Sequence, residues 1–237
     1  MQAKQAGKSG LNRLLASSVG VRLVSDVPER LALWPGPTPI DAKRRKVIDA
    51  IRARGILFVH VPKNAGTSIC ESLYGLQVKH STVTYYQQVA PDVLDLPSFA
   101  ILRDPVQRFV SAFQYACAGG TRDRRVAPAF RRDYGRFEGI DCAIRHMEQG
   151  RDVFAMDHMF RPQSWYVTRR EGGLGVDHLI RYDQLDRLRE FAGLESLKPV
   201  PRLNSGRHLP VELSPRQRAF LHEFYAEDYR LLERTGA

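Results

Sequence analysis

Cysteine is scarce in this sequence, which holds three cysteines in 237 residues: Cys70, Cys117 and Cys142. They form no CxxC pair and have no spacing typical of metal ligands. An odd number of widely separated cysteines favours reduced, buried thiols in a cytosolic protein. The sequence therefore gives no sign of a disulfide scaffold or of a cysteine metal site.

Long apolar runs and repeats are missing as well. No run reaches the ~18 apolar residues of a membrane span, and the N-terminus lacks a compact apolar signal core. The chain has no low-complexity tract and no repeat of fixed period. Its length suits one domain of fair size that can bury a sizeable core. We therefore expect a soluble, cytoplasmic protein without an integral membrane segment.

Acidic residues are fewer than basic ones, 26 against 36, which gives a formal net charge of +10. A soluble protein with a basic surface accounts for this excess. A negatively charged partner also accounts for it, namely a nucleotide, a sulfated or phosphorylated substrate, nucleic acid or an anionic membrane. Net charge alone does not choose among these partners.

The first 54 residues read as an N-terminal segment of helix and linker, followed by one domain over 55–237. Residues 1–25 carry lysines and arginines but no acid, with leucines and valines at roughly helical spacing. A docking N-terminal helix fits this pattern better than a transit peptide or a membrane-surface helix. Four prolines in 27–40 predict an irregular linker, and 41–55 predicts a helix that Asp41 caps and Gly55 ends.

Strand and helix patterns alternate through the rest of the chain. The runs "ILFVHV" (56–61) and "FAILRD" (99–104) are short and continuously apolar, as in strands buried on both faces of a parallel sheet. Each precedes a helix pattern, and 176–194 gives a third strand-to-helix unit. An arginine-rich, helical stretch occupies 119–155, and Ser214 caps a final helix. The pattern predicts an α/β fold with a central parallel sheet flanked by helices in three layers.

The loop "PKNAGTS" (62–68) follows the first strand and has the composition of an anion site. Ala65 and Gly66 allow the backbone to approach a ligand, and N–H groups at a helix N-terminus attract negative charge. Thr67 and Ser68 add hydroxyl donors, while Lys63 adds a mobile cation. The triphosphate loop GxxxxGK[ST] has its lysine where this chain has Gly66, so Lys63 should reach the outer end of the anion.

A second candidate site, "LRDPVQRFVSAF", follows the second strand. Arg103 ends that strand and Ser111 lies eight residues later, a pair that suits a phosphate monoester. Asp104 is the expected helix cap, and Arg108 either binds an anion or lies on the surface. Ligands bind beyond the carboxyl ends of parallel strands, so the two sites predict a ligand with negative groups at both ends.

These two segments resemble the binding motifs of sulfotransferases that use 3′-phosphoadenosine 5′-phosphosulfate (PAPS). "FVHVPKNAGTSI" is similar to their 5′-phosphosulfate loop, and "FAILRDPVQRFVSAF" to their 3′-phosphate element. The nearest branch holds many bacterial sulfotransferases and carbohydrate enzymes such as heparan sulfate 2-O-sulfotransferase. Weaker similarity extends the resemblance over roughly 55–235, through "RPQSWYV", "LIRYDQL", "LNSGR" and "FYAEDYRLLER". One departure is Asn64, where threonine is common.

The resemblance implies a P-loop-like fold in which PAPS donates a sulfuryl group to an acceptor and leaves 3′,5′-ADP, without a metal. The acceptor would offer a hydroxyl or an amine, as a saccharide or glycosylated metabolite does. Lys63 would neutralise charge on the bridging oxygen as the S–O bond breaks. The donor-binding residues carried over are Lys63, Asn64, Ala65, Gly66, Thr67, Ser68, Arg103 and Ser111.

The sequence does not decide which histidine is the catalytic base. His80 comes first, because the heparan branch has its histidine in a similar place ahead of the second motif. His158 comes second and Glu71 is more remote, while His60 reads as packing within the strand. Further residues either line the nucleotide or acceptor site or are structural: Arg161, Gln163, Asn204 and Arg207.

Other functions remain open from the residues alone. A P-loop-like nucleotide kinase would share the fold, although it would need a lysine before Thr67. A nucleic-acid-binding module or a non-catalytic nucleotide-binding protein would explain the positive charge, but no nucleic-acid motif is present and we expect no such partner. Since eukaryotic carbohydrate sulfotransferases usually carry an N-terminal membrane anchor, the resemblance favours a soluble bacterial enzyme in the cytoplasm.

Overall fold

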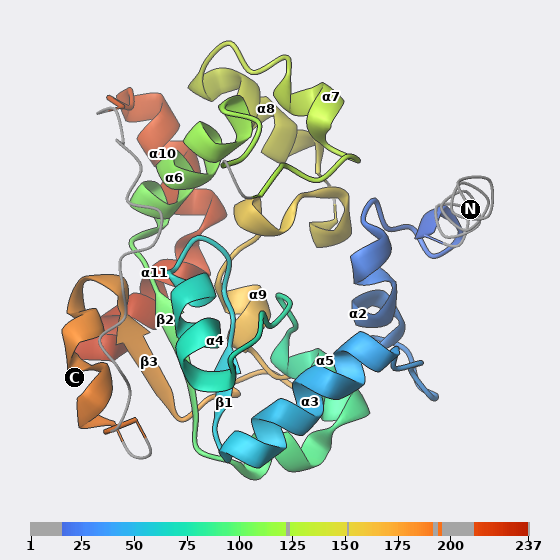
Figure 1. The fold of residues 1–237 in the computed structure, drawn as a ribbon. Coiled ribbons are helices and arrows are strands. Elements are labelled where there is room, and N and C mark those ends of the chain that lie inside the picture. The colour runs from blue at the N-terminus through green and yellow to red at the C-terminus, as the bar shows by residue number, and fades with distance from the viewer. Residues whose placement is uncertain (1–15, 122–123, 151, 192–193, 196–210, 237) are drawn as a thin grey trace.

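The computed structural model describes residues 16–121, 124–150, 152–191, 194–195 and 211–236 (Figure 1). The expectations for residues 1–15 and for Asn204 and Arg207 lie outside these ranges. None of the described helices is both long and apolar enough to cross a membrane.

Three parallel strands form the sheet, in the order β1-β2-β3. Their bounds are Leu57–Val59, Ser98–Leu102 and His178–Arg181. Phe58 of β1 pairs with Phe99 of β2, and Ile101 of β2 pairs with Ile180 of β3. The first two strands are buried along their whole length, as their continuous apolar runs predicted. The parallel α/β architecture expected from the alternating patterns is therefore confirmed.

Helices cover both faces of this sheet and make three layers. Successive strand residues point to opposite faces, so Leu57 and Val59 pack on one side and Phe58 on the other. One face packs against α3, α5, α9 and α11, and the other packs against α4 and η5. Figure 1 shows α4 in front of the sheet, with the strands behind it.

The α-helices are α2 Val27–Leu31, α3 Ala42–Arg54, α4 Gly66–Tyr74, α5 Val83–Val89, α6 Pro105–Cys117, α7 Arg131–Tyr134, α8 Ile140–Gln149, α9 Ser164–Val167, α10 Pro215–Phe224 and α11 Ala226–Glu233. The 3₁₀-helices are η1 Val24–Asp26, η2 Pro91–Asp95, η3 Val153–Ala155, η4 His158–Phe160, η5 Tyr182–Glu190 and η6 Arg234–Gly236.

Helix boundaries follow local capping chemistry, and the caps expected from the sequence are present. Asp41 accepts a hydrogen bond from the Arg44 N–H at 2.8 Å, and α3 ends at Gly55 with a left-handed φ of 70°. Asp104 caps α6 by accepting from the N–H of Gln107, and Ser214 caps α10. Each cap satisfies a helix N–H group that would otherwise lack a partner.

Several expectations are wrong in detail. The proline-rich linker contains α2, which begins beside Pro28, because proline is accepted in the first turn of a helix. After β3 the chain forms the 3₁₀-helix η5, and the closing helix breaks at Tyr225 into α10 and α11. Cys117 is exposed, contrary to the expectation of buried thiols.

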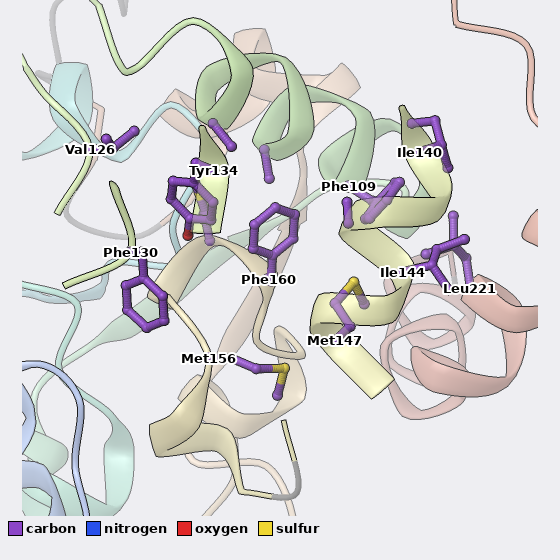
Figure 2. Packing of buried hydrophobic residues seen from close by; sticks show 14 of the residues in the cluster. Phe109, Val126, Phe130, Tyr134, Ile140, Ile144, Met147, Met156, Phe160 and Leu221 are labelled. Carbon is purple, nitrogen blue, oxygen red and sulfur yellow. The ribbon is translucent and has the colours of Figure 1, made fainter. Parts of the chain in front are cut away.

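A second apolar core lies beside the sheet, between α6, α8 and α10 (Figure 2). Phe109 of α6 and Phe160 are fully buried there, with Ile144 of α8 and Leu221 of α10. Phe109 and Phe160 have ring centroids 6.0 Å apart. This core fixes α6, which begins two residues after Arg103, and the 156–160 segment, which carries His158.

Candidate active site

A polar cleft of about 220 Å³ opens where the chain leaves β1 and β2. Both candidate sites contribute to it, since Lys63, Arg103 and Ser111 all line its wall. Its other lining residues are His60, Pro62, Ala65, Gly66, Thr67, Ser68, His80, Tyr115, Thr121, Arg124, Asp157, His158, Met159 and Tyr182. A larger and more apolar cavity of about 410 Å³, between α3 and residues 76–86, contains none of the expected donor-binding or histidine residues.

The loop after β1 has an unusual backbone. Lys63 and Ala65 both have left-handed φ values, 71° and 59°, which non-glycine residues adopt at a cost of about 1–3 kcal/mol each. Within the described chain, no hydrogen-bond acceptor meets the N–H groups of residues 64–67. Successive unpaired N–H groups with left-handed residues make a concave anion nest at the start of α4.

Gly66 is required by the packing beneath the loop. A Cβ atom at this position would lie far inside van der Waals contact of the His60 ring. His60 is buried and its Nδ1 lies 2.9 Å from the carbonyl oxygen of Val78, while burial lowers its pKa to about 4. The ring is therefore neutral and supports the loop from below, as a packing role predicts.

Lys63 reaches over the ring of Tyr115, with Nζ 4.3 Å from the ring centroid. Burial, followed by the charges of Arg103 and Arg108, lowers its pKa to about 8. Within the described chain no carboxylate lies within ion-pair distance of Lys63. The cleft thus holds a cation whose charge is not neutralised by a neighbouring acid.

Arg103 lies at the other side of the cleft. Its guanidinium carbon is 4.6 Å from the centroid of the Tyr182 ring, and its buried Nε has no partner among the described residues. Ser111 is 6% exposed and lines the same cleft. The eight-residue spacing, which runs from the end of β2 into α6, therefore brings the guanidinium and the hydroxyl to one site.

A buried glutamine connects the two loops. Gln163 accepts from Asn64 Nδ2 at 2.7 Å and from the Arg103 N–H at 3.0 Å, and it donates to the Arg103 carbonyl at 2.8 Å. Asn64 also donates to the carbonyl of Ile101 at 2.7 Å. The Asn64 side chain is thus turned into the core, away from the cleft, so any donor contact from this position would come from its backbone.

The C-terminal helices support this glutamine in turn. Asp228 accepts from the backbone N–H groups of Gln163 and Ser164, each at 2.8 Å, and Tyr225 donates to the carbonyl of Phe160 at 2.8 Å. Burial raises the pKa of Asp228, although Arg108 opposes this effect. Arg108 is fully buried and donates to the carbonyl of Pro62 at 3.0 Å. Arg108 is therefore a core residue. Of the two roles expected for it, binding an anion or lying on the surface, the surface location is wrong.

His80 and His158 meet at the cleft, with ring centroids 5.4 Å apart. The His80 Nδ1 lies 3.1 Å from the His60 carbonyl, and burial, then His60 and His158, lower its pKa well below the usual value. The Nε2 of His158 lies 2.5 Å from Asp26 Oδ1. Arg161 forms a buried ion pair with the other oxygen of Asp26 and is thus a structural residue.

Glu71, the remoter candidate base, is exposed on α4 and does not line the cleft. Among the described residues, no group of three or more His, Cys, Asp or Glu side chains is arranged to hold a metal ion.

Several cleft residues were not anticipated from the sequence. Tyr115 lies one helical turn beyond Ser111 on α6. This spacing places both side chains on one face of the helix, so Tyr115 could have been predicted from the sequence. Tyr182 follows directly after β3, at a strand end. Asp26 carried no signal, because its partners lie more than 130 positions away along the chain.

Comparison with known proteins supports the resemblance seen in the motifs. A sequence model of the sulfotransferase family matches residues 48–233, well over half of the chain. The chain belongs to the sulfotransferase family. Neither the curated proteins nor the solved structures gave a match. The matched range includes both cleft loops, the Gln163 segment and the two C-terminal helices, and it begins after Asp26.

Proposed function

We propose that this protein transfers a sulfuryl group from PAPS to a hydroxyl, or an amine, of a saccharide or glycosylated metabolite. The observation that carries the proposal is the convergence of Lys63, Arg103 and Ser111 on one cleft. A donor with a phosphosulfate at one end and a 3′-phosphate at the other needs positive charge at two separated places. The family assignment favours sulfuryl transfer over the phosphoryl transfer of a kinase.

The cleft residues fit such a donor. The N–H groups of residues 64–67 and the hydroxyls of Thr67 and Ser68 would hold the 5′-phosphate, and Gly66 leaves room for close approach. The unpartnered Nε of Arg103 and the Ser111 hydroxyl would hold the 3′-phosphate, which distinguishes this nucleotide from ATP. Tyr182 presents an aromatic ring beside Arg103, next to the same subsite.

When bound, PAPS would supply the activated sulfuryl group. Lys63 would stabilise the negative charge that develops on the bridging oxygen as the S–O bond breaks. It is suited to this task because it is positively charged below its pKa of about 8 and carries no paired carboxylate. A preorganised donor of this kind contributes about 2.7–4 kcal/mol to transition-state stabilisation.

The acceptor must lose a proton, so a base is needed near the outer end of the donor. His80 and His158 line the cleft with Lys63 and are the candidates for this base. A saccharide acceptor is supported by the polar lining of the cleft and by the arginine-rich 119–136 stretch, from which Thr121 and Arg124 reach the cleft.

The proposal is tested by following thermal unfolding of the purified protein with 3′,5′-ADP, 2′,5′-ADP or ATP·Mg²⁺. A ligand at one hundred times its Kd stabilises the folded state by about 2.7 kcal/mol. We expect 3′,5′-ADP to raise the Tm most, and Arg103→Ala to abolish this preference while Arg132→Ala, an exposed arginine on α7, retains it. Preference for ATP·Mg²⁺, or no response to any nucleotide, would overturn the proposal. Radiolabelled PAPS with a panel of saccharides then identifies the acceptor.

A further inference from the structure

Asp26 joins the candidate active site from a part of the chain that the family match does not include. It ends the 3₁₀-helix η1 and is 1% exposed. One of its carboxylate oxygens lies 2.5 Å from Nε2 of His158, and the other pairs with the buried guanidinium of Arg161. These two partners lower the pKa of Asp26 despite its burial, so it is ionised.

The hydrogen bonds set the protonation of both histidine rings. A carboxylate only accepts hydrogen bonds, so Nε2 of His158 carries hydrogen and the Nδ1 of the neutral ring has a free lone pair. A backbone carbonyl also only accepts, so His80 carries its hydrogen on Nδ1. The two neighbouring rings therefore hold opposite tautomers.

The charges around the two rings are also different. His158 has the Asp26 carboxylate at hydrogen-bond distance, which stabilises a positive charge on its ring. His80 faces His60, His158 and the charge of Arg124, and within the described chain no carboxylate bonds to it. Within the described chain, a positive charge that forms during the reaction therefore has a carboxylate partner on His158 and none on His80.

We propose that His158, held by Asp26, is the general base of the transfer reaction, and that His80 stays neutral beside it. This inference rests on the proposed function and reverses the order of the two histidines that the resemblance implied. Nδ1 of His158 accepts the acceptor's O–H proton as the acceptor oxygen bonds to sulfur. At the same time the bond from sulfur to the bridging oxygen breaks, and 3′,5′-ADP leaves with that electron pair. The imidazolium, paired with Asp26, then releases its proton to solvent.

Asp26 is a positioning residue in this scheme, because it acts through His158. It fixes the tautomer and the orientation of the ring, and it compensates the charge that forms during reaction. The charged and titratable groups around Asp26 and His158, which shape the pH dependence of this step, are His60, His80, Arg124, Asp157 and Arg161.

The first test compares His158→Gln with His80→Gln, with His222→Gln on the exposed face of α10 as a matched control. Loss of a general base lowers turnover by about 10²–10⁴-fold. We expect this loss in kcat for His158→Gln, with a smaller loss for His80→Gln and none for the control. Thermal stabilisation by 3′,5′-ADP should persist in all three variants, which separates a failed base assignment from a failed proposed function. A larger loss of kcat in His80→Gln would overturn the proposal.

The second test addresses Asp26 itself. Removing its charge leaves Arg161 buried without a counter-ion and can unfold the chain, so the test uses rescue by imidazole and a variant that keeps the charge. In His158→Ala, added imidazole should restore turnover when Asp26 is present and should fail to do so in Asp26→Asn/His158→Ala. Asp26→Glu, which keeps the charge, should retain more turnover than Asp26→Asn.

A spectroscopic measurement on the wild-type protein requires neither a substituted variant that still folds nor an activity assay. Ring ¹⁵N spectra of histidine-labelled wild-type protein should show Nε2–H for His158 and Nδ1–H for His80. The same tautomer on both rings would contradict the assignment.

Discussion

Asn64 donates a hydrogen bond to Gln163 at 2.7 Å, and this bond joins two residues that are 99 positions apart in the chain. The same glutamine bonds the N–H and the carbonyl of Arg103. One buried side chain thus fixes the spacing between the loop that carries Lys63 and the strand end that carries Arg103. Since the proposed donor spans both, its binding should depend on a residue that does not line the cleft.

Gln163→Ala is therefore expected to weaken both stability and donor binding. It leaves Asn64 Nδ2 and the Arg103 N–H without their shared acceptor, and a buried group without its hydrogen bond costs about 1–3 kcal/mol. Urea unfolding measures the first effect and the KM for PAPS the second, with exposed Gln107→Ala on α6 as control. A loss of stability with unchanged KM would mean that the network does not set the donor site.

Gly66→Ala should disrupt the loop through the ring beneath it. The added methyl group meets His60, which is buried and held by the Val78 carbonyl, and such overpacking costs about 1–3 kcal/mol. We expect a lower Tm and weaker 3′,5′-ADP binding, whereas Gly139→Ala, where a Cβ meets nothing within 4 Å, should change neither. Recovery in the double variant Gly66→Ala/His60→Ala would identify the ring as the cause, and its absence would point elsewhere.

The pH dependence of catalysis should report the charge of Lys63. Its pKa is lowered to about 8 by burial and by two arginines, so the free enzyme loses this cation as pH rises through 8. We expect kcat/KM for PAPS to fall above about pH 8, since this parameter follows ionisations of the free enzyme. In Lys63→Arg the guanidinium stays charged, so this decline should move to higher pH even if turnover is lower. A decline that stays at pH 8 in Lys63→Arg belongs to another group.

Stability should depend on pH through Glu29, whose pKa burial raises from 4.5 to about 7. Its ion pair with Arg44 is 3.8 Å long, too long for a hydrogen bond, so desolvation prevails. The folded state binds this proton more tightly than the unfolded state does. The resulting contribution to the free energy of unfolding is therefore full below pH 4.5 and is lost as pH rises to 7. The loss is about 3 kcal/mol at most.

Urea unfolding of the wild type and Glu29→Gln at several pH values measures this contribution as a difference. His60, whose pKa of about 4 makes stability rise between pH 4 and 6.5, is present in both proteins and cancels. The advantage of wild type over Glu29→Gln should shrink from pH 4.5 to 7, and the exposed substitution Glu71→Gln serves as the control. A constant difference would show that Glu29 is ionised throughout.

Features set by neighbouring residues were predictable from the sequence. Asp41, Asp104 and Ser214 cap helices because the N–H groups they bond lie three positions ahead. The strands were found as short apolar runs, and parallel strands bring their carboxyl ends to one edge, which explains why both cleft loops could be identified.

Features that depend on distant partners were not predictable. Nothing near Asp26 in the sequence indicates a role, and only the fold brings it to His158 and Arg161. Arg108 looked compatible with the surface because nothing near it in sequence indicates that Pro62 accepts its hydrogen bond. The direction of the Asn64 side chain is likewise decided by Gln163.

The support of the "PKNAGTS" loop has a consequence for protein engineering. The His60 ring packs beneath the loop, and Gln163 accepts a hydrogen bond from Asn64 at its side. Asp228 of α11 in turn accepts a hydrogen bond from the backbone N–H of Gln163. A chimera that receives residues 62–68 alone would contain the proposed donor-binding residues without the neighbouring residues that hold the loop in shape. The smallest transferable unit therefore includes residues 160–164 and 225–228, so the C-terminal helices belong to any transplant of this site.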